Sequence, residues 1–145
     1  MFRHILVPTD GSPLSNKAVK AAIAFAKELG AKVTVYHALE VVPPYSGGGF
    51  IPPSALEPYI AGARKQAQKY VEAAVRVARA AGVPCESQMS RPVTVYRGII
   101  DTATKNKCDA VFIASHGRGE LTSLVLGSVT LKVLAHSKIP VVVFR

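Results

Sequence analysis

Short runs of apolar and β-branched residues alternate with longer stretches of helical periodicity along this chain of 145 residues. The runs predict five strands, at 4–7, 32–39, 85–89, 110–114 and 139–144. Apolar positions at helical spacing predict helices that follow Ser12-Pro13, span 62–81 and 93–107, and begin near Gly127-Ser128. The fold class is therefore α/β: a single open five-stranded parallel sheet with helices on both faces, formed by one domain of residues 1–145.

One long segment breaks this alternation. Residues 41–58 contain five prolines and three consecutive glycines, Gly47 to Gly49, with neither a helical nor an alternating period. Such a composition predicts an irregular loop. The sequence leaves open whether this loop covers a site or only connects two elements.

The composition excludes several classes of protein. Hydrophobic residues make up 49% of the chain and glycine plus proline number 11 + 10 = 21, which rules out disordered and collagen-like classes. No segment approaches the ~20 apolar residues of a membrane-spanning helix, and the N-terminal apolar run is too short for a signal peptide. Cys85 and Cys108 lack metal-type spacing and are expected to be buried small residues, which favours a cytoplasmic protein.

The net charge of 18 − 9 = +9 invites a nucleic-acid interpretation. The basic residues are, however, scattered along the chain. The densest groups lie at helical spacing and are expected on one solvated helix face: Arg64, Lys65, Lys69, Arg76 and Arg79. We therefore do not expect specific binding of nucleic acid, although small polyanions would be attracted.

Ligands of open parallel sheets bind beyond the carboxyl ends of the strands. Two strand ends carry unusual polar sequence, the segment 8–11 (PTDG) and the segment 115–119 (SHGRG). Farther on, Gly127-Ser128 begins a predicted helix whose first amides could hold an anion. Plain helix capping explains Gly127-Ser128 equally well, and Asp10 could simply brace its own turn.

The chain resembles the universal stress protein family in the segments ILVPTDGS, VYHALE, AVFIASHGRG, GSVTLKVLAHS and IPVVVFR. One branch of that family binds ATP through the pattern G-x-x-G, nine residues, then G-[ST]. Here Ala114 to Gly117 are followed by nine residues and then Gly127-Ser128, so Ala114 replaces the first glycine. The resemblance implies a Rossmann-like fold of the adenine-nucleotide alpha hydrolase type.

The resemblance also implies roles for individual residues. Pro8, Thr9 and Asp10 would contact ribose and adenine, and Ala38 and Ile113 would form the adenine wall. Ala114 would face the ribose, where its methyl group is expected to weaken binding. The phosphates would be contacted by six residues, namely His116, Gly117, Gly127, Ser128, Val129 and Thr130. We add Arg118 as a cation free to reach the terminal phosphates.

The resulting hypothesis is a homodimeric stress protein that binds ATP, ADP or AMP and acts in regulation or protection. Mg²⁺ or Mn²⁺ would bind through the phosphates. The dimer would pair through strand 141–144 if that strand lies at the sheet edge. Two alternatives stay open: an interaction protein whose glycine loop is vestigial, and a weak ATPase. The remaining histidines, His4, His37 and His136, are expected to be structural or surface residues.

Overall fold

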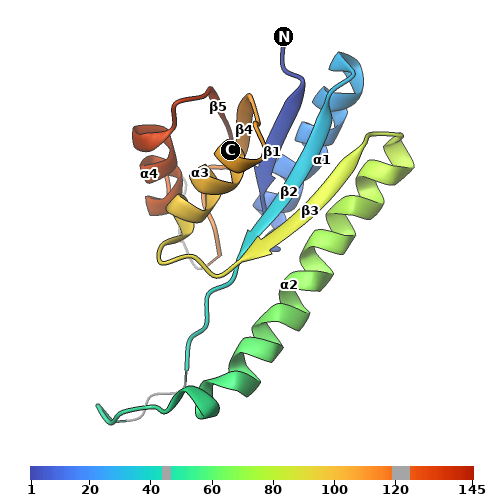
Figure 1. Ribbon diagram of the computed structural model, residues 1–145. Coiled ribbons are helices and arrows are strands. Elements are labelled where there is room, and N and C mark those ends of the chain that lie inside the picture. Colours follow the sequence, from blue (N-terminus) through green and yellow to red (C-terminus); the bar gives the residue numbers. More distant parts are fainter. Residues whose placement is uncertain (44–46, 119–124) are drawn as a thin grey trace.

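The computed structural model describes residues 1–43, 47–118 and 125–145, and it contains the expected alternation of strands and helices (Figure 1). The elements in chain order are β1 (His4–Pro8), α1 (Pro13–Leu29), β2 (Lys32–Ala38), α2 (Pro53–Ala81), β3 (Cys85–Ser90), α3 (Val95–Lys105), β4 (Ala110–Ala114), α4 (Ser128–His136) and β5 (Val141–Phe144). The α/β prediction is confirmed.

All five strands pair in parallel in the order β3-β2-β1-β4-β5. The winding direction reverses at β1, because β2 and β3 lie on one side of it and β4 and β5 on the other. Ligands of open sheets bind at such a reversal, outside the carboxyl ends of the strands. The ends of β1 and β4 are therefore neighbours, which brings the segments 8–11 and 115–118 to the same edge of the sheet.

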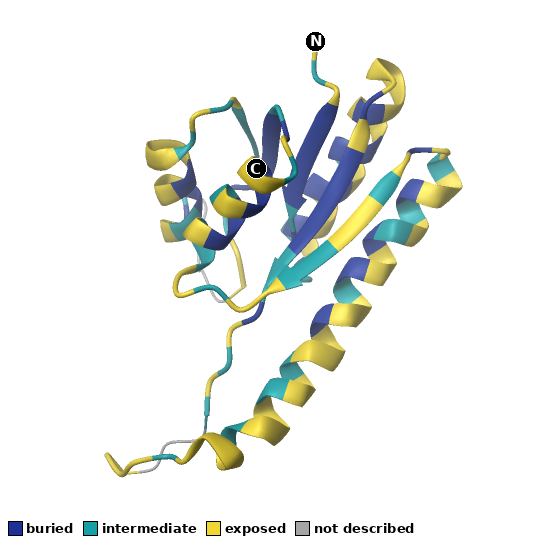
Figure 2. Ribbon diagram, in the orientation of Figure 1, coloured by how far each residue is buried: buried dark blue, intermediate teal, exposed yellow. Residues whose placement is uncertain are grey.

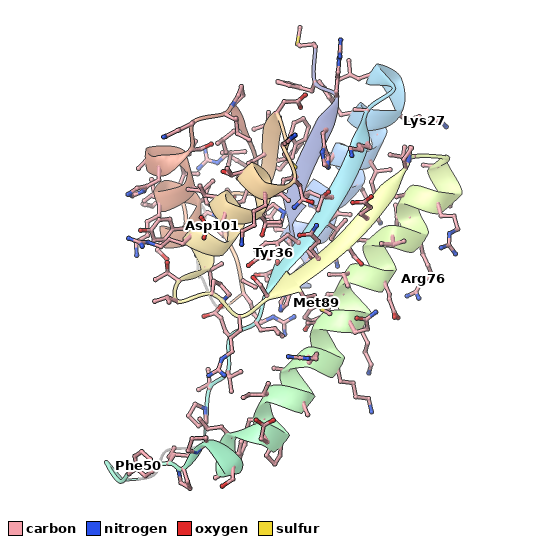
Figure 3. All side chains as sticks on the ribbon, in the orientation of Figure 1. Lys27, Tyr36, Phe50, Arg76, Met89 and Asp101 are labelled. Carbon is pink, nitrogen blue, oxygen red and sulfur yellow. The ribbon has the colours of Figure 1, made fainter. Side chains whose placement is uncertain are left out.

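Helices cover both faces of the sheet, and each face has its own core. Alternate residues of β1 show this, because Ile5 and Val7 pack with α1 and α2, whereas Leu6 packs with α3 and α4. Figure 2 shows the central strands β1 and β4 as almost wholly buried. Tyr36, labelled in Figure 3, belongs to the core on the α3 face. Its hydroxyl forms a hydrogen bond of 2.7 Å with the Ser90 hydroxyl.

Helix α2 begins earlier than predicted. It starts at Pro53 rather than near residue 62, so the prediction of an irregular loop is wrong for residues 53–58. Pro53 occupies the first helical position, where the missing N–H costs nothing, and Pro58 lies within the exposed first turns. No residue of α2 before Ala67 is buried, and the helix extends past the sheet towards Phe50 (Figures 1 and 3). Residues 44–46 of the predicted loop lie outside the described residues.

Other boundaries differ from the predictions by about two residues. Helix α3 spans 95–105 rather than 93–107, and β5 begins at Val141 rather than at residue 139. Leu121 and Leu124, part of the helical spacing before α4, lie outside the described residues. Strand β5 is an edge strand. In the described part of the chain, no helix combines the length and apolar character needed to cross a membrane.

Candidate functional site

A cavity of about 470 Å³ opens at the carboxyl ends of β1 and β4. Its walls come from the ends of β1, β2 and β4, the starts of α3 and α4, and the inner side of α2. Twelve of the thirteen residues predicted for the site line it: Pro8, Thr9, Asp10, Ala38, Ile113, Ala114, His116, Gly117, Arg118, Ser128, Val129 and Thr130. The thirteenth, Gly127, is buried directly behind this wall at the N-cap of α4.

Asp10 joins the two loops that form the mouth of the cavity. One carboxylate oxygen accepts the Ser12 N–H at 2.9 Å, which braces the turn into α1. The other oxygen accepts the Arg118 N–H at 2.6 Å, across from the loop after β4. Burial raises the pKa of Asp10, but the hydrogen bonds from Ser12, Ser15 and Arg118 outweigh burial and hold the pKa below its ordinary value. The ionised form of the carboxylate is therefore favoured, and each of its two oxygens accepts one backbone N–H.

Two glycines let these loops approach closely. Gly11 has φ +77°, and a Cβ there would lie 2.2 Å from the ring of Tyr70 on α2. At Gly117, a Cβ would lie 2.8 Å from the Asp10 carboxylate. Any side chain at either position would push apart groups that now touch. The glycines thus keep the β1 loop, the β4 loop and α2 in contact around the cavity.

Arg118 is not the free cation that we expected. Its guanidinium Nη2 donates to the Asp10 carbonyl at 3.1 Å and to the Tyr70 hydroxyl at 2.6 Å. The guanidinium carbon lies 5.2 Å from the Tyr70 ring centroid, within cation–π range. The expectation was wrong because two acceptors lie within reach of the guanidinium. The Asp10 carbonyl holds it to the segment after β1, and the Tyr70 hydroxyl holds it to α2.

His116 is anchored to the chain before α4. Its Nε2 donates to the carbonyl of Val125, and its Nδ1 lies 2.9 Å from the Ser115 hydroxyl. A carbonyl can only accept, so Nε2 carries a hydrogen. The imidazole therefore helps to fix the loop after β4 relative to the start of α4.

The start of α4 is tied to the end of β4 by two further hydrogen bonds. The Gly127 N–H donates to the Ser115 carbonyl at 2.7 Å, and the buried Thr130 hydroxyl donates to the Ala114 carbonyl at 2.8 Å. The hydroxyl of Thr130 thus donates its hydrogen within the protein, and its contact with phosphate oxygens stays a prediction. Among the residues that the structure describes, no side chain makes a capping hydrogen bond at the N-terminus of α4, and the first turn of this helix lines the cavity through Ser128 and Val129.

Sequence reasoning missed the part of the wall that α2 provides, and of the wall at the end of β2 it found only Ala38. Tyr70, His37 and Glu40 all line the cavity. His37 donates through Nδ1 to the Thr9 carbonyl at 2.7 Å, and its ring centroid lies 5.6 Å from that of Tyr70. His37 is therefore structural, as expected, but it is also part of the site. Helical spacing placed Tyr70 on the inner face of α2; it gave no information about which strand end that face covers.

Metal ligation by the protein itself is not supported in the residues that the structure describes. No group of three or more histidine, cysteine or acidic side chains is positioned to hold an ion in these ranges. Asp10 and Glu40 are the carboxylates that line the cavity, and both oxygens of Asp10 already accept N–H groups.

The sequence matches the profile of the universal stress protein family over residues 1–145. It is 34% identical, over 146 residues and the full length of both chains, to a universal stress protein from Thermus aquaticus. The fold resembles that of a universal stress protein in complex with cAMP, with a TM-score of 0.73, 22% identity and 99% and 97% of the two chains covered.

A second solved structure has a similar fold. It is a universal stress protein family protein from Arabidopsis thaliana with AMP bound, with a TM-score of 0.70, 14% identity and 97% and 90% of the two chains covered. At these identities the two solved structures bear on the fold, whereas the match over the whole chain establishes the family. The chain therefore belongs to the universal stress protein family.

Proposed function

We propose that this chain binds ATP, ADP or AMP in the cavity at the carboxyl ends of β1 and β4. The observation that carries the proposal is the convergence of the predicted residues on one cavity, at the point where the winding of the sheet reverses. The cavity volume lies within the range of small-molecule sites. Solved relatives in complex with cAMP and with AMP make an adenine nucleotide the first ligand to test.

The charge and geometry of the cavity suggest how the ligand would lie. Ala38 and Ile113 lie on strands flanking β1 and offer apolar contacts to a base. The N-terminus of α4, with Ser128 and Val129 in its first turn, would face the phosphates, and the positive end of the helix dipole would favour their charge. Because both oxygens of Asp10 are engaged, Mg²⁺ or Mn²⁺ would be held chiefly by the phosphates.

The proposed role is regulatory or protective in the stress response, and its proposed location is the cytoplasm. We further propose that residues 1–145 form one domain and that two copies pair through β5. Strand β5 lies at the edge of the sheet, so its outer backbone groups have no strand neighbour there. A signalling role fits a cavity whose described residues include no arranged nucleophile and base. The alternative function is that of an interaction protein whose glycine loop no longer binds nucleotide. It is favoured by Ala114, which replaces the first glycine of the ATP-binding motif.

The test replaces Ser128 by glutamate. The new carboxylate would lie in the first turn of α4, where negative charge stabilises a helix, so the fold should be retained. The same charge would repel phosphates, and we expect at least a tenfold loss of ATP affinity by calorimetry, about 1.4 kcal/mol. Ser54→Glu, at an exposed position near the start of α2, makes the same charge change far from the cavity and should leave affinity within twofold.

Two results would contradict the proposal. One is wild-type protein that shows neither co-purified nucleotide in native mass spectrometry nor heat of ATP binding. The other is an affinity for ATP that Ser128→Glu leaves unchanged while the variant remains folded by circular dichroism.

A further inference from the structure

A second hollow, of about 440 Å³, adjoins the cavity. It lies beyond the end of β2, between the segment that leads into α3 and the first turns of α4. Five residues line both spaces, which makes them neighbouring compartments: Leu39, Glu40, Val95, Ser128 and Val129. The two compartments are similar in volume, so each has room for a group of about the same size.

The second hollow carries positive charge that the protein itself does not neutralise. Arg91 and Lys132 line it, and both are exposed. Within the described ranges, neither side chain makes a hydrogen bond or an ion pair, and the Lys132 ammonium lies 5.7 Å from the Tyr96 ring centroid. Glu40, at the boundary with the cavity, is the carboxylate among the lining residues. The balance of the lining is therefore cationic.

The ends of two helices add to this positive character. Thr94 is the N-cap of α3 and also lines the hollow, and its side chain makes no capping hydrogen bond. Ser128, in the first turn of α4, lies at the opposite wall. The positive end of a helix dipole favours an anion, and here it acts together with the two cationic side chains.

The hollow also has an aliphatic side. Val93 is 99% exposed and Val42 is 84% exposed, and Pro92 and Val41 lie beside them. These side chains give an occupant of the hollow an apolar surface to contact. An occupant that suits the hollow therefore combines anionic groups with an apolar portion.

We propose that the second hollow receives the distal half of a dinucleoside polyphosphate whose first nucleoside occupies the cavity. This inference rests on the proposed function. Ser128 lines both compartments, so a phosphate chain held there would continue towards Arg91 and Lys132. The second nucleoside would then contact the aliphatic side formed by Val42 and Val93, and the similar volumes of the two compartments match a ligand with two similar ends.

The experiment compares ATP with diadenosine tetraphosphate by calorimetry on the full chain. Their phosphate chains are similar in charge, so general attraction to a protein of net charge +9 affects both. We expect the dinucleotide to bind at least tenfold more tightly than ATP. The double variant Arg91→Ala with Lys132→Ala should abolish this preference and change ATP affinity less than threefold.

A matched control removes the same charge elsewhere. Arg79, in the last turn of α2, and Lys138, after α4, are exposed and line neither compartment. The double variant Arg79→Ala with Lys138→Ala should keep the preference for the dinucleotide. If both double variants lose it equally, general electrostatics explains the preference and the inference is wrong.

The remaining outcomes separate this inference from the proposed function. Binding of ATP without any preference for the dinucleotide would overturn the inference and leave the proposed function intact. Failure of wild-type protein to bind either ligand would overturn both. A third arm adds tripolyphosphate to protein saturated with AMP; binding that requires Arg91 and Lys132 would identify a site for free phosphates and overturn the dinucleotide assignment.

Discussion

Gly11 is the position where one added methyl group tests how closely α2 is held over the end of β1. An alanine there would have to keep φ near +77°, which costs about 1–2 kcal/mol. Its Cβ would also lie 2.2–2.5 Å from three atoms of the Tyr70 ring, so the ring would have to move. Moving it breaks the hydrogen bond from Arg118, worth about 0.5–1.5 kcal/mol, and the cation–π contact, worth about 0.5–1 kcal/mol.

The sum predicts a loss of about 2–4.5 kcal/mol in the free energy of unfolding for Gly11→Ala, measured by urea denaturation. Gly30 supplies a matched control, because it has φ +65° and nothing within 4 Å of an added Cβ. Gly30→Ala should therefore show the backbone cost alone, about 1–2 kcal/mol. In a Tyr70→Ala background, the further cost of Gly11→Ala should fall to that same value. Equal losses for Gly11→Ala and Gly30→Ala in the wild-type background would refute the reasoning.

Three further predictions concern pH, the motif and assembly. Burial, and then the nearby charge of Lys32, lowers the pKa of His4 from its ordinary 6.5, so the unfolded chain binds the proton at higher pH than the folded chain. Stability should be full above about pH 6.5 and fall below it, and His4→Gln should flatten that fall in urea titrations; an unchanged pH dependence would contradict this cause. Ala114→Gly restores the motif glycine and should tighten ATP binding severalfold by calorimetry, whereas unchanged affinity would show that the methyl group does not crowd the ligand. Val142→Lys places a charge on the edge strand β5 and should give a monomer by light scattering; a persistent dimer would rule out pairing through this strand.

The strands and their approximate limits could be predicted because a strand that is buried on both faces consists of a continuous run of apolar residues. The run 110–114, all apolar, is an example, and every residue of β4 is buried. The early start of α2 could not be predicted in this way. Pro52, Pro53 and Pro58 have the composition of a loop, and only the structure shows that two of them occupy the exposed first turns of a helix.

The site divides in the same way. Residues on loops that follow strands, such as Asp10 and Gly117, were predictable because chain order places them at the carboxyl edge of a parallel sheet. Tyr70 belongs to the cavity only because of how α2 crosses that edge, which depends on packing between distant segments. The Arg118 side chain is held in turn by the Tyr70 hydroxyl. Because Tyr70 was missing from the predicted site, Arg118 was expected to be a free cation.

The first part of helix α2 is a place where residues could be added to or removed from this chain. At about 1.5 Å per residue, its 29 residues form a rod of roughly 44 Å. Only the portion from Ala63 onward lines the cavity, and only the portion from Ala67 onward enters the core. Whole turns could therefore be inserted or deleted before Ala63 without altering either the packing of the sheet or the shape of the cavity.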